Sequence, residues 1–282
     1  MCINGIFDAK ICVVKGKCGM KLSVCNIAWT AEHDAKMYGK MKELGMEGIE
    51  IAPTRIFPDV PYEHLSGARL FAEQLKKEYG LSVASMQSIW YQRTEKLFGS
   101  EAERETLLFY TKQAIDFAEA AGCPNLVFGS PKNRVTQGAD CHETAVRFFG
   151  ELGQYAAEHH TCLSLEANPA IYGTDFINRT TEAFALVKEV DSKGFAVNID
   201  FGTILANEED LSFLTEENLP YINHIHISEP YLAPVQRRSL HEEFAKRLGA
   251  LGYDRYVSAE MKTAEQTEDV FAVLSYMKEV FA

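Results

Sequence analysis

The sequence predicts one domain with the fold of a (β/α)8 barrel, and three observations support this prediction. The 282 residues are long for an ordinary domain but close to the length of about 250 residues that is typical of such barrels. Short β-rich segments alternate with amphipathic helical segments along the chain. Side chains of metal-binding types also stand near the ends of the last four β-like segments.

Eight short apolar segments have the composition of buried strands. They are residues 22–29, 48–53, 81–88, 125–131, 161–168, 195–203, 222–230 and 256–262. Regular alternation of such segments with helices implies parallel strands joined by right-handed crossovers. Eight such units close most economically into a barrel. Because no linker or low-complexity segment interrupts the pattern, we expect residues 20–282 to form one catalytic domain.

Helical patterns fill the intervals between these segments. In residues 35–45, Met37, Met41 and Leu44 form one apolar stripe. Residues 105–122 form a longer pattern that ends at a glycine, the residue type that most often follows a helix. Residues 145–159 show the spacing of a helix packed against a sheet.

The first residues of the chain look different from the rest. Residues 1–19 lack the long apolar core and the small-residue cleavage site of a signal peptide. The strand pattern begins after Met20, so we expect residues 1–19 to be a dispensable extension or Met20 to be the natural start. The seven cysteines are odd in number and form no CxxC pair. Reduced thiols in a cytoplasmic protein are therefore expected.

Composition and charge exclude several classes of function. Hydrophobic residues make up 46% of the chain and charged residues 24%, as in a globular protein with a large core. Apolar runs are too short for a membrane span, so no membrane partner is expected. The formal charge of −12 argues against a nucleic-acid partner, which needs a basic face. Phosphate-binding glycine motifs of nucleotide folds are also missing from the sequence.

Four residues give the strongest functional signal. Glu166, Asp200, His226 and Glu260 lie near the ends of four successive predicted strands. In a barrel of parallel strands, these ends meet at the face where catalytic sites form. Three carboxylates gathered there beside an imidazole repel one another unless a divalent cation lies among these groups. This set of ligands favours Mn²⁺, with Mg²⁺ or Co²⁺ as alternatives, over a thiolate-bound zinc.

Further polar residues are candidates for the same face of the barrel. His224 precedes His226 by two residues, so we expect it to lie one layer deeper as an interior residue and not as a ligand. Lys132 and Arg134 follow the fourth predicted strand, where they could bind an acidic group or simply be solvated. The candidates for binding substrate hydroxyl groups, with interior salt bridges and loop hydrogen bonds as the alternative, are Glu50, Gln87, Asn168, Glu229 and Lys262.

The motifs LEANP, NIDFGT, HIHISEP and AEMK resemble those of the xylose-isomerase-like sugar isomerase and epimerase superfamily. The resemblance covers Met20 to the C-terminus and is most specific to D-tagatose 3-epimerase-like members. It implies that the four residues bind Mn²⁺ or a similar ion. It also implies that Glu166 and Glu260 act as acid and base, while Asp200 and His226 are ligands only. Many relatives form dimers or tetramers, so a homo-oligomer is expected.

Three positions depart from the tagatose epimerase pattern. Thr203 stands where that pattern has a histidine, Tyr172 where it has a glutamate, and Leu232 where it has an arginine. An insertion in the last loop would let Arg237 or Arg238 replace the arginine. These departures leave the metal chemistry in place and the sugar open. The missing histidine also argues against the DNA-repair branch of the superfamily, which needs it for a zinc cluster.

The sequence thus predicts a divalent-metal-dependent isomerase or epimerase that acts on a small sugar or sugar derivative. A cation that holds the carbonyl and hydroxyl oxygens would stabilise the enediolate formed when a proton leaves the neighbouring carbon. Two glutamates on opposite faces of that carbon could remove and return the proton. A metal-dependent dehydratase or lyase is the alternative, and a non-catalytic carbohydrate-binding barrel is the third hypothesis.

Overall fold

The computed structural model describes residues 19–136 and 141–282, and eight parallel strands form its centre. The strands are β1 (Lys21–Val24), β2 (Gly48–Ile51), β3 (Ser82–Met86), β4 (Leu126–Phe128), β5 (Leu163–Glu166), β6 (Phe195–Asp200), β7 (Ile222–Ile227) and β8 (Tyr256–Ala259). From β2 to β8 each strand pairs with the next one in the chain, and β8 pairs with β1. A single bridge between Cys25 and Glu50 joins the ends of β1 and β2 and brings the barrel close to closure.

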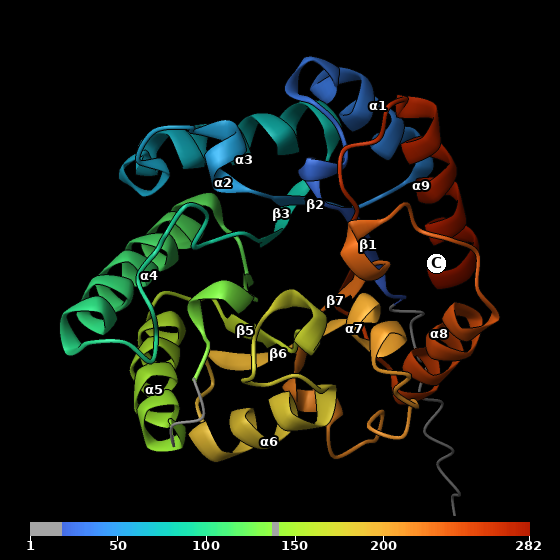
Figure 1. Cartoon of the computed structure of the whole chain (residues 1–282). Coiled ribbons are helices and arrows are strands. Elements are labelled where there is room, and N and C mark those ends of the chain that lie inside the picture. The colour runs from blue at the N-terminus through green and yellow to red at the C-terminus, as the bar shows by residue number, and fades with distance from the viewer. Residues whose placement is uncertain (1–18, 137–140) are drawn as a thin grey trace, which may run out of the picture.

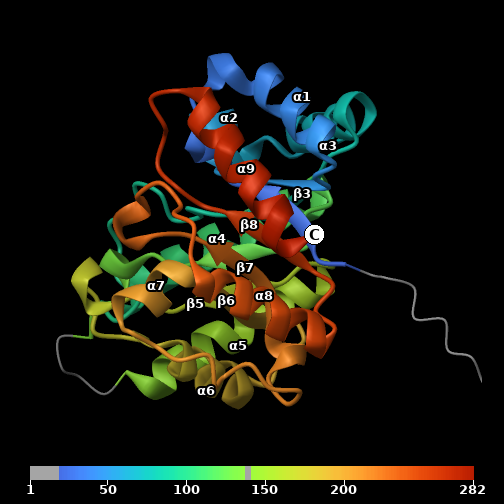
Figure 2. The same cartoon turned by 90° about the vertical axis from the view of Figure 1, so that its right-hand side faces the viewer.

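Helices surround the strands on the outside (Figure 1). In the described part of the chain, the α-helices are α1 (Asp34–Leu44), α2 (Pro53–Ile56), α3 (Leu65–Tyr79), α4 (Glu101–Ala121), α5 (His142–Glu158), α6 (Thr180–Val190), α7 (Phe201–Ala206), α8 (Ser239–Leu251) and α9 (Thr267–Phe281). The last of them, α9, packs against α1 and β1, so the two ends of the described chain meet (Figure 2). The predicted (β/α)8 fold is therefore confirmed.

Every predicted strand segment overlaps one observed strand, but the observed strands end earlier. The clearest case is β6, which ends at Asp200 although the apolar pattern continues to residue 203. Residues Phe201–Ala206 instead form α7, and the Asp200 side chain accepts a hydrogen bond from the backbone N–H of Thr203 to cap this helix. The capping bond turns the chain from strand to helix at the rim of the barrel and fixes Asp200 there.

The three predicted helices also recur, and each begins earlier than expected: α1 by one residue, α5 by three and α4 by four. Helix α4 begins at Glu101, before the expected residue 105, because Ser100 and Glu103 form a capping box that satisfies the free N–H groups of its first turn. It ends as expected before Gly122, which has a φ of +62° and donates its backbone N–H to Ala118. A side chain at this left-handed position would strain the backbone.

The register of the strands decides which residues meet at the carboxyl end of the barrel. Asp200 pairs with His226, Glu166 pairs with Asn198, and His226 pairs with Ser258. Asp200 and His226 are thus direct partners. Asn198 lies two residues before the predicted ligand Asp200, and Ser258 lies two residues before the predicted ligand Glu260. Strands of a barrel tilt and stagger, so residues at different positions along neighbouring strands reach the same height.

Three further predictions concern the chain as a whole. Residues 1–18 lie outside the described residues, and the prediction that 1–19 is dispensable stays a prediction. Cys25, Cys123 and Cys162 are buried free thiols. Among the described residues, no helix is both long enough and apolar enough to span a membrane.

Candidate metal centre

The four predicted ligands come together at the carboxyl end of the barrel. Glu166 and Asp200 are the last residues of β5 and β6, His226 lies in β7, and Glu260 directly follows β8. Each offers one ligand atom, and these four atoms all lie within 4.8 Å of one another. Nδ1 of His226 is 3.1 Å from Oε2 of Glu166 and 3.2 Å from Oε2 of Glu260. The structure therefore forms the group that the sequence predicted.

A cavity of about 400 Å³ opens above this group. Glu166, Asp200 and Glu260 are among its lining residues, whereas His226 is fully buried beneath them. Asp200 and Glu260 expose only 8% of their surface each. Carboxylates that are this enclosed can ionise only at a cost unless a positive charge compensates them.

The pKa values of the acids reflect this crowding. Burial raises the pKa of Glu260 to about 7, and the charges of Glu166 and Glu50 add to this against the opposing effect of His226. Burial together with the charge of Glu166 raises the pKa of Asp200 to about 6. A divalent cation would relieve both effects, so the residues present fit the metal that the sequence predicted.

The imidazole of His226 points to the same conclusion. Burial alone would lower the pKa of His226, but the surrounding carboxylates Glu50, Glu260 and Glu166 raise it well above its ordinary value. The pocket therefore favours a positive charge at this position. A bound cation would take the place of the proton on Nδ1, the nitrogen that faces the group.

Hydrogen bonds hold the first two acids in place. Both oxygens of Asp200 have donors: the Ser228 hydroxyl on Oδ1, and the backbone N–H of Thr203 at 2.8 Å on Oδ2. Oε2 of Glu166 accepts from Nδ2 of Asn198 at 2.7 Å, and Oε1 accepts from Nδ2 of Asn168 at 2.8 Å. These bonds leave little rotational freedom to either carboxylate, which suits a site formed in advance of its ion.

A buried arginine supports the same loop. Nη2 of Arg134 donates to the carbonyl oxygen of Glu166 at 2.8 Å and to Oδ1 of Asn168 at 2.7 Å. One of the two hypotheses for Arg134 was a solvated loop residue. The Arg134 side chain is fully buried, so this hypothesis is wrong for Arg134. Its bonds fix the amide of Asn168 with its NH2 group toward Glu166.

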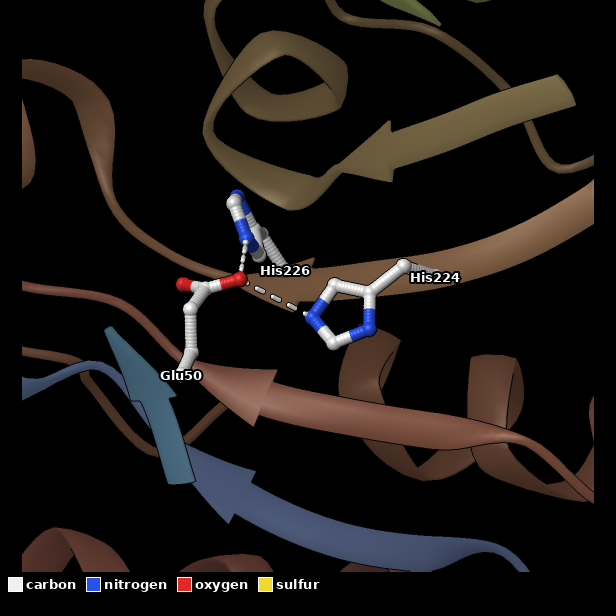
Figure 3. Close-up of side chains that lie close together, drawn as sticks. All are labelled: Glu50, His224 and His226. Carbon is white, nitrogen blue, oxygen red and sulfur yellow. Dashed lines mark hydrogen bonds and ion pairs between the residues drawn. The ribbon is translucent and has the colours of Figure 1, made fainter. Parts of the chain in front are cut away.

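Glu50, His224 and His226 form a second cluster, with the carboxylate of Glu50 between the two imidazoles (Figure 3). None of the three lines the cavity. Oε2 of Glu50, from β2, lies 2.9 Å from Nε2 of His226 and 3.1 Å from Nε2 of His224. Glu50, His224 and His226 are all fully buried. Burial opposes the ionisation of Glu50, but the two imidazoles outweigh it and hold the pKa of this carboxyl below its ordinary range. His224 thus lies in the interior, as the alternation along the strand predicted.

Comparison with known proteins places this barrel in a family. Residues 39–279 match the family model described as xylose isomerase-like TIM barrel. The chain belongs to this xylose isomerase-like family. A search of curated proteins gives no significant match.

Solved structures of similar fold include sugar epimerases. The apo structure of 3-keto-D-glucoside 4-epimerase from E. coli aligns with a TM-score of 0.72 at 20% identity and covers 92% of this chain and 99% of its own. D-psicose 3-epimerase, solved in the presence of D-fructose, aligns with a TM-score of 0.72 at 17% identity, covering 93% and 99%. The IOLI protein with a bound zinc atom aligns with a TM-score of 0.69 at 14% identity, covering 93% and 97%. At these identities the likeness shows the fold.

Three of the six residues predicted to bind substrate lie at the cavity. Gln87, Asn168 and Glu229 line it. Glu229 forms a two-point ion pair with Arg238, in which Nε lies 2.8 Å from Oε1 and Nη2 lies 2.5 Å from Oε2. Of the two arginines that follow the Leu232 loop, Arg238 is therefore the one that contacts the cavity wall, through Glu229.

The other three candidates lie elsewhere. Glu50 is buried below the metal group and lines no part of the cavity. Lys262 and Arg237 line a separate depression, and Arg237 pairs with Glu279. The expectation that Lys262 shares the face of Glu260 assumed an extended strand, but β8 ends at Ala259, so the two-residue alternation does not reach Lys262.

Two of the three departures from the epimerase pattern shape the cavity wall. Tyr172 and Leu232 both line the cavity, together with Tyr231. The backbone N–H of Tyr231 donates to the Tyr172 hydroxyl at 2.8 Å, and the two rings meet edge to face. Tyr231 and Leu232 have φ angles of 60° and 53°, a left-handed turn that points this loop at the cavity. The third departure, Thr203, is fully buried and donates hydrogen bonds to Asp200 from its backbone N–H and its hydroxyl.

Several residues of the site were not among the sequence candidates. Asn198 lies two residues before Asp200 on the same strand, which is the same spacing that singled out His224 before His226. Ser228 lies two residues after His226 and follows the same alternation. Extending this alternation from each ligand would have identified both residues.

Proposed function

We propose that this protein is a divalent-metal-dependent isomerase or epimerase that acts on a sugar or sugar derivative. One observation carries the proposal: four ligand-type side chains converge at the floor of a cavity that is open to substrate. Glu166, Asp200, His226 and Glu260 would hold the ion, with Mn²⁺ as the preferred metal and Mg²⁺ or Co²⁺ as alternatives. The epimerase neighbours and the family support the sugar class of the substrate.

The two glutamates have the properties that proton transfer requires. Both line the cavity, so each can contact a bound substrate. Without metal, the pKa of Glu260 is raised to about 7, so its environment favours proton uptake near neutral pH, and a bound cation would lower this pKa. A bound divalent cation would stabilise negative charge on the substrate oxygens. Glu260 and Glu166 would then remove a proton from the carbon beside the carbonyl and return one, which inverts that carbon or moves the carbonyl.

The charge of the cavity supports a substrate without a phosphate group. Its lining includes the carboxylates of Glu166, Asp200, Glu229 and Glu260, and no described lysine, arginine or histidine. One divalent cation would not balance the three acids that bind it, and Glu229 is already paired with Arg238. A phosphate ester would add negative charge with no described cationic side chain in the wall to receive it.

Exchange of substrate hydrogen with solvent tests this function. Protein loaded with Mn²⁺ should introduce deuterium from D2O into at least one member of a panel of ketoses and keto-glycosides. The Glu260→Gln variant should lower that rate by roughly 100-fold or more, as loss of a general base does. Exposed Glu265, replaced by glutamine, is the matched control and should retain full activity. Exchange that persists in Glu260→Gln would contradict the role of Glu260.

The same panel separates the alternatives. A product that has lost the elements of water identifies a dehydratase or lyase, which also begins with removal of a proton. Absence of both divalent-ion binding and hydrogen exchange would favour the third hypothesis, a non-catalytic carbohydrate-binding barrel. Location in the cytoplasm, assembly into homo-oligomers, and the absence of membrane and nucleic-acid partners stay predictions.

A further inference from the structure

The two ring nitrogens of His226 face different groups. Nδ1 lies toward the cavity, within 3.2 Å of an oxygen of Glu166 and of Glu260. Nε2 points the opposite way, and Oε2 of Glu50 lies 2.9 Å from it (Figure 3). Of these two environments, only the first contains the other predicted ligands.

Glu50 restricts where the proton of His226 can reside. An ionised carboxylate can accept a hydrogen bond but cannot donate one, so Nε2 must carry the proton in this contact. The neutral imidazole then has its lone pair on Nδ1, which faces the ligand group. His224 approaches the same oxygen of Glu50 from the side, with its ring at 90° to that of His226. Glu50 is therefore held between two imidazoles.

We propose that Glu50 is a positioning residue that fixes the tautomer and the ring orientation of His226, so that Nδ1 is presented to the metal. This inference rests on the proposed metal site and assigns Glu50 a role other than substrate binding. Carboxylates that hold the second nitrogen of a metal-binding histidine also make that ligand more basic. Because Glu50 is fully buried and lines no part of the cavity, any effect it has on metal or substrate must pass through its neighbours.

A second metal ion is the competing interpretation of the same cluster. Glu50, His224 and His226 also have ligand atoms within 4.8 Å of one another. An ion there would require His226 to bind metal through both nitrogens and so to lose both ring protons. All three side chains are enclosed, and none of them lines a described cavity through which an ion could enter. A hydrogen bond explains the 2.9 Å contact without either requirement.

Nitrogen NMR of the wild-type protein tests the tautomer directly. With ¹⁵N-labelled histidine and diamagnetic Zn²⁺ as the probe, His226 should show a protonated Nε2 and a metal-bound Nδ1. A proton on Nδ1 would overturn the proposal. Loss of the proton from both nitrogens, with two zinc ions per chain, would instead establish the second metal site. A wild-type protein that binds no divalent ion would overturn both this proposal and the proposed function.

Metal affinity tests the role of the carboxylate. Glu50→Gln keeps the size of the side chain but replaces the carboxylate with an amide. The amide can either accept a hydrogen bond from Nε2 of His226 or donate one to it, so it no longer fixes the tautomer. We expect Mn²⁺ affinity, measured by chelator competition, to fall by about 10- to 100-fold. The absorption spectrum of the Co²⁺-loaded protein should also change, which a general loss of stability would not cause. Unchanged affinity and an unchanged spectrum would contradict the proposal while leaving the proposed function intact.

A neighbouring variant controls for disturbance of the core. His224→Gln alters an equally buried side chain that contacts the same oxygen of Glu50 but lies outside the ligand group. We expect its effect on Mn²⁺ affinity to be smaller than that of Glu50→Gln. Equal losses would mean that the core as a whole, and not the Glu50–His226 contact, sets the affinity. If Glu50→Gln does not fold, Glu50→Asp, which retracts the carboxylate and keeps its charge, replaces it.

Discussion

Gly129 leaves the space that the carboxylate of Glu166 occupies. A Cβ atom at residue 129 would stand 2.9 Å from Oε1 of Glu166 and 3.4 Å from Oδ1 of Asn168. Real Cβ atoms are almost never that close to an oxygen, so Gly129→Ala must displace the carboxylate. Such overpacking lowers the free energy of unfolding by roughly 1–3 kcal/mol, and here the group that must move is the predicted metal ligand Glu166. We expect Mn²⁺ affinity to fall by about 10-fold or more, measured by isothermal titration.

Gly150 provides the matched control for this substitution. It lies in α5, where an added Cβ would meet no atom within 4 Å. Gly150→Ala should therefore leave Mn²⁺ binding unchanged and stabilise the helix by roughly 0.5–1 kcal/mol. If Gly129→Ala bound Mn²⁺ as tightly as Gly150→Ala, the carboxylate of Glu166 would not be held where the structure places it.

The stability of the metal-free protein should fall as the pH rises toward neutrality. Folding raises the pKa of Glu260 from 4.5 to about 7 and that of Asp200 from 3.8 to about 6. Between the lower and the upper value of each pair, the folded protein holds a proton that the unfolded chain has released. Stability therefore decreases with pH in this window, the reverse of the trend for a carboxylate in a salt bridge. Thermal unfolding in a chelator, at about pH 5 and about pH 8, measures the effect.

Mn²⁺ should reverse this trend, because it binds the deprotonated acids. The increase in unfolding temperature produced by a fixed excess of Mn²⁺ should be larger at about pH 8 than at about pH 6. Glu260→Gln should remove part of the difference, since it lacks the carboxyl group whose pKa is raised to about 7. An equal Mn²⁺-induced shift at both pH values would contradict the assignment of these acids as ligands.

Ser228 links the acid of β6 to the loop after β7. Its hydroxyl donates to Oδ1 of Asp200 and accepts the backbone N–H of Gly202 at 2.8 Å. Ser228→Ala leaves both buried groups without this partner, which costs about 1–3 kcal/mol of unfolding free energy in denaturant titration. It should also raise the pKa of Asp200 further, because the hydroxyl bond lowers it.

An exposed serine separates these effects from the loss of a hydroxyl in general. Ser275 lies in α9, and its hydroxyl donates to the carbonyl of Phe271 at the surface. Ser275→Ala should be neutral or slightly stabilising, since alanine favours a helix. A Ser228→Ala variant as stable as Ser275→Ala would mean that the Asp200 contact contributes nothing.

Much of this site could be predicted from the sequence because strand alternation and barrel closure are regular. Asp200 pairs directly with His226, and Glu166 pairs with Asn198, two residues before Asp200, so strand register and stagger together bring the three near one another. Strand alternation gives less guidance where the chain leaves its strands. Lys262 lies beyond the end of β8, so alternation no longer decides which way it faces.

Glu50 shows a different limit of sequence analysis. Its position on β2 correctly indicated that it points into the barrel, but not at what depth. The depth depends on the stagger between β2 and β7, which are far apart in the sequence and on different sides of the barrel. The pairing of Glu229 with Arg238 was likewise hidden, because a left-handed turn at Tyr231 and Leu232 sets the course of the loop between them.

The charge of the cavity leads to a last prediction, on substrate choice. Because its described wall holds four carboxylates and no lysine, arginine or histidine, a free ketose should be preferred over its phosphate ester. Deuterium exchange into D-ribulose and D-ribulose 5-phosphate, a pair that differs only in the phosphate, measures this preference. We expect kcat/KM for the phosphate ester to be lower by roughly 10-fold or more, as for an unpaired charge in a like-charged site. Leu232→Arg, which places a cation in the wall, should narrow the gap, and faster exchange into the phosphate ester by the wild type would contradict the charge argument.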